Sequence, residues 1–302
     1  MKSLLEVLTS GAAYLQKHGV DEARLNMEHL LAHVLGCRRL DLYLRFEERL
    51  HEETLVPMRD LLKRRGEGVP LQHLLGTVDF LGHELVSDHR ALIPRPETEH
   101  LVDWLIREVK ANRMPKPASV LDMATGSGCI GLALAAAWKE SRVQLADISE
   151  DALDLARLNA SRLKLDAVHM VRSDLFEKVP GRFDFIVSNL PYIPTAEVAT
   201  LSREVRQDPV LALDGGPDGL DIVRRFLDEV PKHLTPGGGI ALEVGDDQGA
   251  RTAALAEAAG FLEVRVIPDL AGIQRFVLGV HPGVPEEPVE EVSAEVAESV
   301  EA

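Results

Sequence analysis

Short apolar runs alternate with segments of helical periodicity between residues 119 and 189. The apolar runs lie at 119–123, 143–147, 167–171 and 183–189, and helical segments follow at 130–138 and from about 150. Such alternation is typical of βαβ units, in which parallel strands are joined by helices that cover both faces of one sheet. The pattern therefore predicts a doubly wound α/β domain.

Three further strand-like runs follow at 239–244, 261–266 and 275–280. Only eight residues separate the last two runs, which is too short for a crossover helix, so these two strands are expected to run antiparallel. We therefore expect one antiparallel strand at the end of an otherwise parallel sheet.

A smaller helical domain is expected before the sheet. Apolar residues recur at helical spacing over residues 4–75, with Asp21 as the expected N-cap of the second helix and Gly36 as its C-terminal stop. Short apolar runs within residues 77–92 favour a β-hairpin, and a helix is expected over about 97–111.

These patterns divide the chain into four parts. They are a helical domain at 1–75, a β-hairpin linker at 76–96, the α/β domain at 97–281 and an acidic tail at 282–302. The tail is rich in Pro, Glu and Val and carries charge of one sign, so we expect it to be disordered.

The charge balance argues against a nucleic-acid substrate. The formal net charge is −16, and the last 22 residues contribute seven Glu and no Lys or Arg, which leaves about −9 on the rest. Proteins that grip many phosphates usually present a basic face. Two cysteines and no apolar run of about 20 residues favour a reduced, cytoplasmic compartment without a membrane span.

A glycine-rich segment joins the first strand of the α/β domain to its helix. Gly126, Gly128 and Gly131 match G-x-G-x-x-G, in which glycines let the backbone turn and approach a nucleotide closely. Asp147 ends the second strand and could accept hydrogen bonds from both ribose hydroxyls, or could instead cap the following helix. The motif fits a dinucleotide or S-adenosylmethionine.

Two further acidic residues favour S-adenosylmethionine over a dinucleotide. Asp122 precedes the glycines, where it could orient the methionine portion directly or through water, and Thr125, three residues later, is also expected to contact the cofactor. Asp174 follows the third strand and could accept from the adenine amino group, although a turn or cap role is the alternative.

An Asn-Leu-Pro-Tyr sequence stands at the carboxyl end of the fourth strand, where open α/β sheets build their ligand crevice. The Asn189 side-chain oxygen and the Leu190 carbonyl could each accept one N–H and so hold a planar amino or amide nitrogen towards a methyl donor. Pro191 would stiffen the loop, and Tyr192 could pack its ring on a flat acceptor. A strand-ending turn with a buried Tyr is the alternative.

The segment SNLPYIP resembles the SNPPYIP of the glutamine methyltransferases of peptide-chain release factors. The likeness extends in order over about residues 1–280, through LIPRPETEHLV, VLDMATGSGCIGLALA, DISEDALDLARLNA, SDLF, LSREVRQDPVLALDGGPDGL, LTPGGGIALEVGDDQG and DLAGIQRFV. Two positions depart from the pattern, since Leu190 replaces the first Pro of the motif and Ala124 replaces a common Gly.

The resemblance implies a class I fold and methyl transfer from S-adenosylmethionine to the side-chain amide of the Gln in the Gly-Gly-Gln motif of release factors. It implies that residues 189–192 hold this Gln, that Gly126, Asp147 and Asp174 contact the cofactor, and that Arg95 and Glu97 lie near the pocket. By the same likeness residues 1–75 recognise the substrate, and we expect a monomer.

Asn-Leu-Pro-Tyr is also typical of ribosomal-RNA adenine dimethyltransferases, so adenine-N6 methylation of RNA or DNA is the alternative function. The acidic charge, the helical domain placed before the catalytic one and the RPETE segment speak against it. An NAD-dependent oxidoreductase is a third possibility, but hydride transfer does not call for an Asn-Leu-Pro-Tyr sequence.

Other polar clusters receive structural interpretations. His29 and His33 lie four residues apart on one helix face, but the Glu of the zinc-protease motif is missing and Cys37 lies beyond the helix stop, so no metal site is expected. The run 63–65, Lys-Arg-Arg, is interpreted as a solvated helix end, because basic side chains favour that position.

Overall fold

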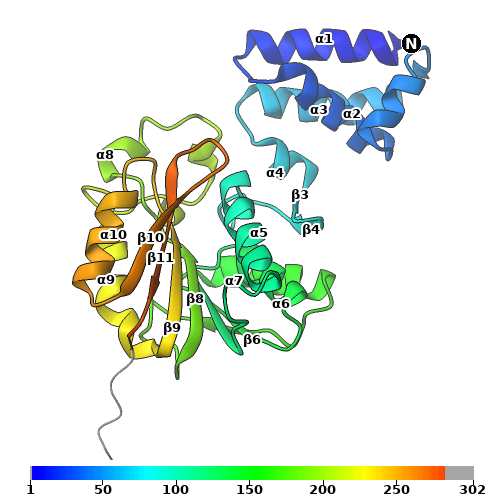
Figure 1. The fold of residues 1–302 in the computed structure, drawn as a ribbon. Helices are drawn as coiled ribbons and strands as arrows, with labels where there is room; N and C mark the ends of the chain where they lie inside the picture. Colours follow the sequence, from blue (N-terminus) through cyan, green and yellow to red (C-terminus); the bar gives the residue numbers. More distant parts are fainter. Residues whose placement is uncertain (1, 283–302) are drawn as a thin grey trace, which may run out of the picture.

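The computed structural model describes residues 2–282, which form a helical domain, a hairpin and a larger α/β domain (Figure 1). The predicted tail therefore lies outside the described residues, apart from Pro282. Among the described residues, no helix combines the length and the apolar character needed to cross a bilayer.

The helical domain packs around one apolar core. It contains β1 (Lys2–Ser3), α1 (Leu4–Lys17), α2 (Ala23–Leu35), η1 (Arg39–Leu44), β2 (Arg49–Leu50), α3 (Glu52–Gly66) and α4 (Leu71–Leu75). The helices bury side chains that recur at helical spacing, including Leu4, Leu8, Leu15, Met27 and Leu31. Ser3 and Glu6 form a capping box that satisfies the free N–H groups at the start of α1.

The start of α2 corrects one prediction. The helix begins at Ala23, and its N-cap is Glu22 in a left-handed conformation (φ 49°), without a side-chain cap bond, so Asp21 is not the cap. The backbone oxygen of Asp21 instead accepts a hydrogen bond from Asn26 Nδ2. The predicted stop at Gly36 is confirmed, because this residue takes the left-handed conformation (φ 59°) that glycine adopts at little cost.

The hairpin and the helix that follows it lead into the α/β domain. Strands β3 (Thr77–Phe80) and β4 (His83–Val86) pair antiparallel, which confirms the predicted hairpin. The two strands occupy only the first part of the predicted range 77–92. Helix α5 (Pro96–Lys110) begins with Pro at its first position, where a missing N–H costs nothing.

The large sheet has seven strands in the order β10-β11-β9-β8-β5-β6-β7. Its strands are β5 (Ser119–Met123), β6 (Arg142–Asp147), β7 (His169–Arg172), β8 (Phe183–Asn189), β9 (Leu234–Glu243), β10 (Leu262–Pro268) and β11 (Gln274–Val280). Strand β11 runs antiparallel to both of its neighbours. The single antiparallel strand is thus confirmed. It lies between β9 and β10 rather than at the sheet edge, because the chain first passes from β9 to the edge position of β10 and then returns to the position between the two strands.

Helices cover both faces of the sheet (Figure 1). They are α5, α6 (Cys129–Ala137) and α7 (Glu150–Arg162) on one face, and α9 (Asp221–Glu229) and α10 (Gly249–Ala258) on the other. Alternate side chains of β8 serve the two cores, since Phe185 and Val187 pack with the first group and Ile186 with the second. Helix α8 (Thr195–Val198) and the short turns η2 (Val205–Gln207), η3 (Val210–Ala212) and η4 (Val230–His233) complete the chain.

Contacts from the loop after α8 tie the two domains together. The Arg65 guanidinium donates to Glu204 Oε1 at 2.7 Å, and Arg203 Nη2 donates to the backbone oxygen of His18 at 2.7 Å. Arg65 is buried and also donates to Asn26 Oδ1. The interpretation of residues 63–65 as a solvated helix end is therefore wrong for Arg65, because this side chain crosses the interface between the domains.

Candidate functional site

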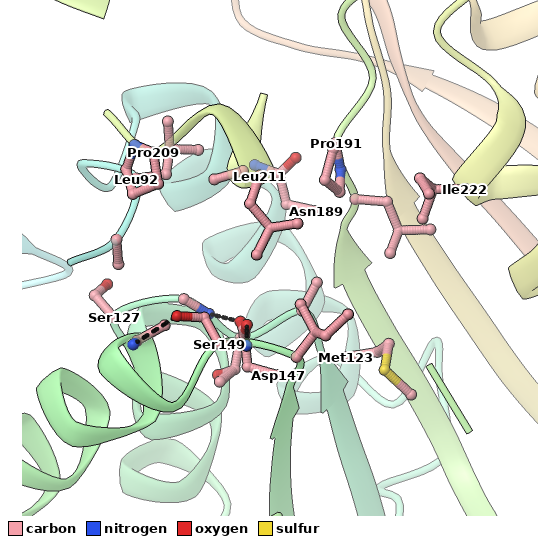
Figure 2. Close-up of a pocket in the computed structure, with 18 of the residues that line it drawn as sticks. Leu92, Met123, Ser127, Asp147, Ser149, Asn189, Pro191, Pro209, Leu211 and Ile222 are labelled. Carbon is pink, nitrogen blue, oxygen red and sulfur yellow. Dashed lines mark hydrogen bonds between the residues drawn. The ribbon is translucent and has the colours of Figure 1, made fainter. Parts of the chain in front are cut away.

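A cavity of about 240 Å³ opens at the carboxyl ends of β5, β6 and β8. Its walls come from the linker, the glycine loop, the ends of these strands and the loop around η3. The predicted residues that line it are Arg95, Thr125, Gly126, Asp147, Asp174, Asn189, Leu190 and Pro191. Figure 2 shows Asp147 and Ser149 on one side of this cavity and Leu211 and Pro209 on the other.

Asp122 lies beneath the glycine loop and does not line the cavity. Its Oδ2 atom accepts hydrogen bonds from Thr125 Oγ1 at 2.5 Å and from the Gly131 backbone N–H at 2.8 Å, while Oδ1 has no partner among residues 2–282. Burial raises the pKa of Asp122 to about 7. Asp122 therefore supports the glycine loop from beneath and does not face the cavity. This position differs from the predicted direct contact of Asp122 with the methionine portion.

The glycines of the loop have different tasks. Gly126 (φ 56°) lines the cavity, and its N–H donates to Asp147 Oδ2 at 2.8 Å. Gly128 (φ 84°) precedes α6 and does not line the cavity, and a Cβ there would lie 2.9 Å from the Leu132 side chain. Gly128 is therefore required by backbone conformation and helix packing, whereas Gly126 presents its backbone to the cavity.

Asp147 faces the cavity at the end of β6. Its two carboxyl oxygens accept from the backbone N–H groups of Gly126 and Ser149, and burial raises its pKa although these N–H groups oppose the shift. The alternative role as helix cap is wrong, because the N-cap of α7 is Ser149, whose side chain accepts from Ala152 N–H. Asp147 thus closes the glycine loop against the neighbouring strand.

Asp174 also lines the cavity, after β7. Its Oδ1 atom accepts from Arg225 Nη2 at 3.0 Å, on α9. The carboxylate is therefore held at the cavity wall by an ion pair, and the backbone oxygen of Asp174 also accepts from Glu177 N–H, so the alternative role as a turn residue is observed too.

Asn189 ends β8 with its side-chain amide in a fixed orientation. Its Nδ2 atom donates to Thr98 Oγ1 at 3.1 Å and to Glu243 Oε1 at 3.0 Å. Both N–H bonds are thereby used within the protein. Among the described residues, the Asn189 Oδ1 atom has no donor, so this acceptor is available to a ligand in the cavity.

Glu243 is a residue of the site that the sequence analysis did not identify. It ends β9 beside Asn189, is buried, and burial raises its pKa to about 7 against the opposing effects of Thr98, Arg275 and Asn189. The available signal was a carboxylate near the end of the predicted apolar strand at 239–244, because Asn189 holds the equivalent place at the end of the neighbouring strand β8.

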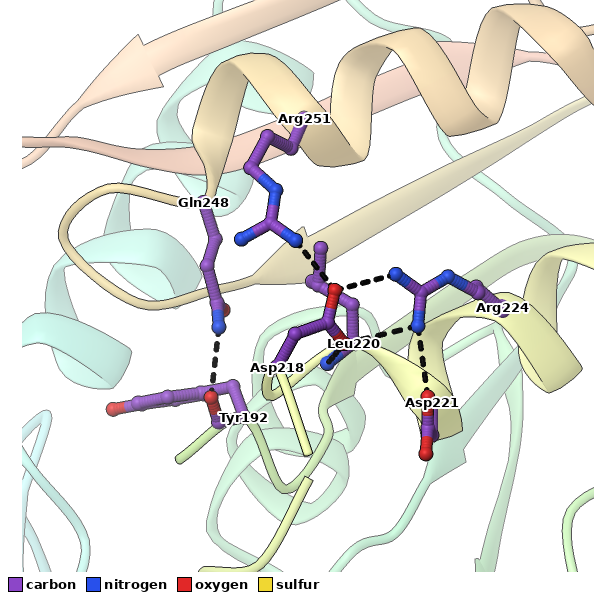
Figure 3. Close-up of polar contacts among 7 residues, drawn as sticks. All are labelled: Tyr192, Asp218, Leu220, Asp221, Arg224, Gln248 and Arg251. Carbon is purple, nitrogen blue, oxygen red and sulfur yellow. Dashed lines mark hydrogen bonds and ion pairs between the residues drawn. The ribbon is translucent and has the colours of Figure 1, made fainter. Parts of the chain in front are cut away.

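The rest of the Asn-Leu-Pro-Tyr segment divides between the cavity and the protein interior. Leu190 and Pro191 line the cavity, and Leu190 is buried. Tyr192 does not line it, and burial raises the pKa of its hydroxyl to about 12. Its backbone oxygen accepts from Gln248 Nε2 at 2.8 Å, next to a loop where Asp218 pairs with Arg224 and Arg251 (Figure 3).

The two residues that the resemblance places near the pocket, Arg95 at the end of the linker and Glu97 in α5, also differ in position. Arg95 lines the cavity and donates to Asp208 Oδ2 at 2.5 Å, whereas Glu97 is not part of the lining. Burial raises the pKa of Asp208 to about 6, and the Arg95 charge opposes this shift. Asp208 was not predicted from the sequence, since it lies in an irregular segment 113 residues away from Arg95. This ion pair holds the loop around η3 against the linker.

The cavity therefore offers two kinds of contact. Asp147, Asp174 and the Gly126 backbone form a polar wall suited to a nucleoside, and Asn189, whose Oδ1 atom is an acceptor, and Leu190 line the cavity nearby. In the described part of the chain, no group of three or more His, Cys, Asp or Glu is placed to hold a metal ion.

Comparisons with known proteins match both domains. Residues 6–76 match the PrmC N-terminal domain, and residues 102–207 match the methyltransferase small domain. The chain is 43% identical over 91% of its length to a release factor glutamine methyltransferase of Deinococcus radiodurans, covering 97% of that protein. A protein of the same name from Rhodopirellula baltica is 39% identical over 91% of this chain and 95% of its own length.

A solved structure supports the fold alone. The crystal structure of a methyltransferase from Pyrococcus furiosus superposes with a TM-score of 0.50 at 20% identity, over 68% of this chain and 91% of that one. Together with the matched methyltransferase small domain, the seven-stranded sheet with one antiparallel strand has the class I methyltransferase fold that the sequence predicted.

Proposed function

The chain belongs to the release factor glutamine methyltransferases, and we propose that it transfers a methyl group from S-adenosylmethionine to the side-chain amide nitrogen of a release-factor glutamine. The glutamine is that of the Gly-Gly-Gln motif, as the resemblance implies. The enzyme acts in the cytoplasm as a monomer and needs no contact with nucleic acid.

The cavity fits the cofactor in its donor set. Asp147 lies at the end of β6, and its carboxylate accepts from the backbone on one side, which leaves lone pairs for ribose hydroxyls. Asp174 is held at the wall by Arg225 and can accept from the adenine amino group. When bound there, S-adenosylmethionine supplies an electrophilic methyl group next to a positive sulfur.

Asn189 and Leu190 provide the acceptor half of the site. An amide nitrogen is a weak nucleophile because its lone pair is delocalised into the carbonyl. Two acceptors that take its two N–H groups hold the nitrogen in one place and favour the positive charge that develops on it. The orientation of Asn189, with Nδ2 turned into the protein, is the observation that carries this proposal.

Pro191 and Tyr192 act on the shape of this half-site. Pro191 limits the backbone freedom of the residue after the Leu190 carbonyl. Tyr192 is set by the Gln248 hydrogen bond to its backbone, and we propose that its ring packs beside the glutamine once the release-factor loop is bound. Glu97, which precedes Thr98 on α5, borders the same region from outside the cavity lining.

Asn189→Ala tests the proposal. This change removes one acceptor and should lower turnover by on the order of 10²–10³-fold, as losing one preorganised polar group does in other active sites. Cofactor affinity, measured by calorimetry, should change little. Labelled S-adenosylmethionine and a release factor serve as the assay.

The control is on the substrate. A release factor with Gly-Gly-Ala in place of Gly-Gly-Gln must take no label, and peptide mass analysis must place the methyl group on that Gln in the parent. Label that persists in the Gly-Gly-Ala protein, or label found only on deproteinised ribosomal RNA, would overturn the proposal in favour of adenine methylation.

A further inference from the structure

A side-chain amide can present either its oxygen or its nitrogen to a ligand. In the proposed reaction the Asn189 oxygen must face the glutamine, because the glutamine nitrogen brings N–H donors and an Asn189 NH₂ group could not accept them. Rotation of the amide by half a turn would therefore disable the site without moving any backbone atom. The orientation must be enforced by neighbours.

Two buried neighbours oppose that rotation. Thr98 and Glu243 are each 2% exposed, and Asn189 Nδ2 donates to both of them. Turning the amide would leave Nδ2 without these two acceptors, which is costly in a buried site, and would bring Asn189 Oδ1 against Glu243 Oε1, which repels it when the carboxyl group is ionised.

The two neighbours come from elements that are distant in sequence. Glu243 ends β9 and pairs in register with Asn189 on the parallel strand β8. Thr98 lies in the first turn of α5, directly after the hairpin linker. The three side chains therefore meet only when helix α5 docks on the sheet.

We infer that Thr98 and Glu243 are positioning residues that lock the Asn189 amide with its oxygen towards the acceptor. The inference rests on the proposed function for its kinetic consequence. This inference also gives helix α5 a role in catalysis, because Thr98 reaches the site from that helix.

The first experiment is a double-mutant cycle on methyl transfer. Thr98→Val keeps the shape but removes the hydroxyl, so kcat should fall by about 3- to 10-fold with the cofactor Kd unchanged, as for the loss of one hydrogen bond. Thr98→Ser should restore kcat. In an Asn189→Ala background, Thr98→Val should cause no further loss, because the residue acts through Asn189.

Thr252→Val is the matched control. Thr252 is a fully buried threonine on α10 whose hydroxyl has no hydrogen-bond partner within the residues that the structure describes, so this change should leave kcat unchanged. A full Thr98→Val loss in the Asn189→Ala background would overturn the inference, since Thr98 would then act independently of Asn189.

A second readout is independent of the methyl acceptor. The Asn189 side-chain NH₂ signals, identified by their disappearance in Asn189→Ala, should exchange slowly with water in the parent and faster in Thr98→Val and Glu243→Met. Thr98→Ser should keep the slow exchange. Equal exchange rates in parent and Thr98→Val would refute the lock, even if the release-factor reaction is confirmed.

Discussion

Glu243 is a buried carboxyl group whose Oε2 atom has no hydrogen-bond partner in the described part of the chain. Its pKa is raised from 4.5 to about 7, and burial is the first cause. The folded protein therefore holds a proton on this group at pH values where the unfolded chain has released it. Such a group contributes stability below the unfolded pKa and loses that contribution as the pH rises through the folded pKa.

Glu243→Gln should remove this pH dependence. Between about pH 4.5 and 7.5 the parent should lose on the order of 3 kcal/mol of stability relative to the variant, from a cost of about 1.4 kcal/mol per pKa unit. Urea unfolding of both proteins at several pH values measures this difference. The cost of burying Gln in place of Glu243 does not depend on pH, so it does not affect the change of this difference with pH. Parallel curves of stability against pH would contradict the expectation.

Asp147→Ala tests the cofactor wall at the same scale. We expect the Kd for S-adenosylmethionine to rise by about 10- to 100-fold, because hydrogen bonds to a charged group contribute about 1.5–3 kcal/mol. Helix α7 should remain intact, since Ser149 rather than Asp147 caps it. An unchanged Kd in calorimetry, with an unchanged circular dichroism spectrum, would mean that Asp147 only secures the Gly126 loop.

The site residues differ in how far the sequence could predict them. Asp147 and Asn189 were accessible because each ends a strand of strong apolar pattern beside a recognisable motif. Thr98, Asp208 and Glu243 were not predicted, since their roles depend on partners that lie 54 or more residues away in the chain. Contacts of that range follow from the docking of elements, which local patterns do not specify.

At the scale of elements, the connection from β5 to α6 contains an unusual residue. Ala124 adopts a left-handed conformation (φ 55°), which residues other than Gly rarely adopt. A Cβ in this region costs about 1–3 kcal/mol. The loop keeps its shape because Thr125 N–H donates to the Ala146 oxygen and Thr125 Oγ1 donates to Asp122.

Ala124→Gly should therefore stabilise the protein. Relief of backbone strain outweighs the greater freedom of Gly in the unfolded chain, which costs about 0.4–1 kcal/mol, so we expect a gain of up to about 1 kcal/mol. The urea midpoint of unfolding measures it. Ala146→Gly, a fully buried position in strand β6, is the matched control and should destabilise. A lower midpoint for Ala124→Gly would show that its Cβ contacts matter more than strain.

The element order was predictable, and the finer placement was not. Strands, the hairpin and α5 follow from apolar periodicity, which reports burial along each element. The insertion of β11 between β9 and β10 leaves no local signal, because either order satisfies the same alternation. The loop with η2 and η3 also lacked a signal, since its order comes from the Arg95–Asp208 ion pair and from contacts with the helical domain.

At the scale of the molecule, that loop contacts both the cavity and the helical domain. Pro209 and Leu211 line the cavity, and Glu204 binds the buried Arg65 of α3. Arg65 keeps two further partners within its own domain, Asn26 Oδ1 and the Val69 backbone oxygen. The side chain of Glu204 is 41% exposed, so its removal should leave the helical domain folded and affect mainly the link between the domains.

Glu204→Ala should therefore weaken the use of a folded release factor more than that of a short peptide. If residues 1–75 recognise the protein substrate, loosening their position raises KM for the whole factor by about 2- to 5-fold, as expected for a loss of up to about 1 kcal/mol. A peptide containing Gly-Gly-Gln contacts only the cavity, so its kcat/KM should stay within about twofold, by the same reasoning on the size of the lost interaction. Glu197→Ala, at an exposed position of α8, is the control and should change neither value. Equal losses of activity with the release factor and with the peptide would indicate that Glu204 acts on the cavity, through the loop around η3. No loss for either would mean that the Arg203 contact with the His18 backbone fixes the domains by itself.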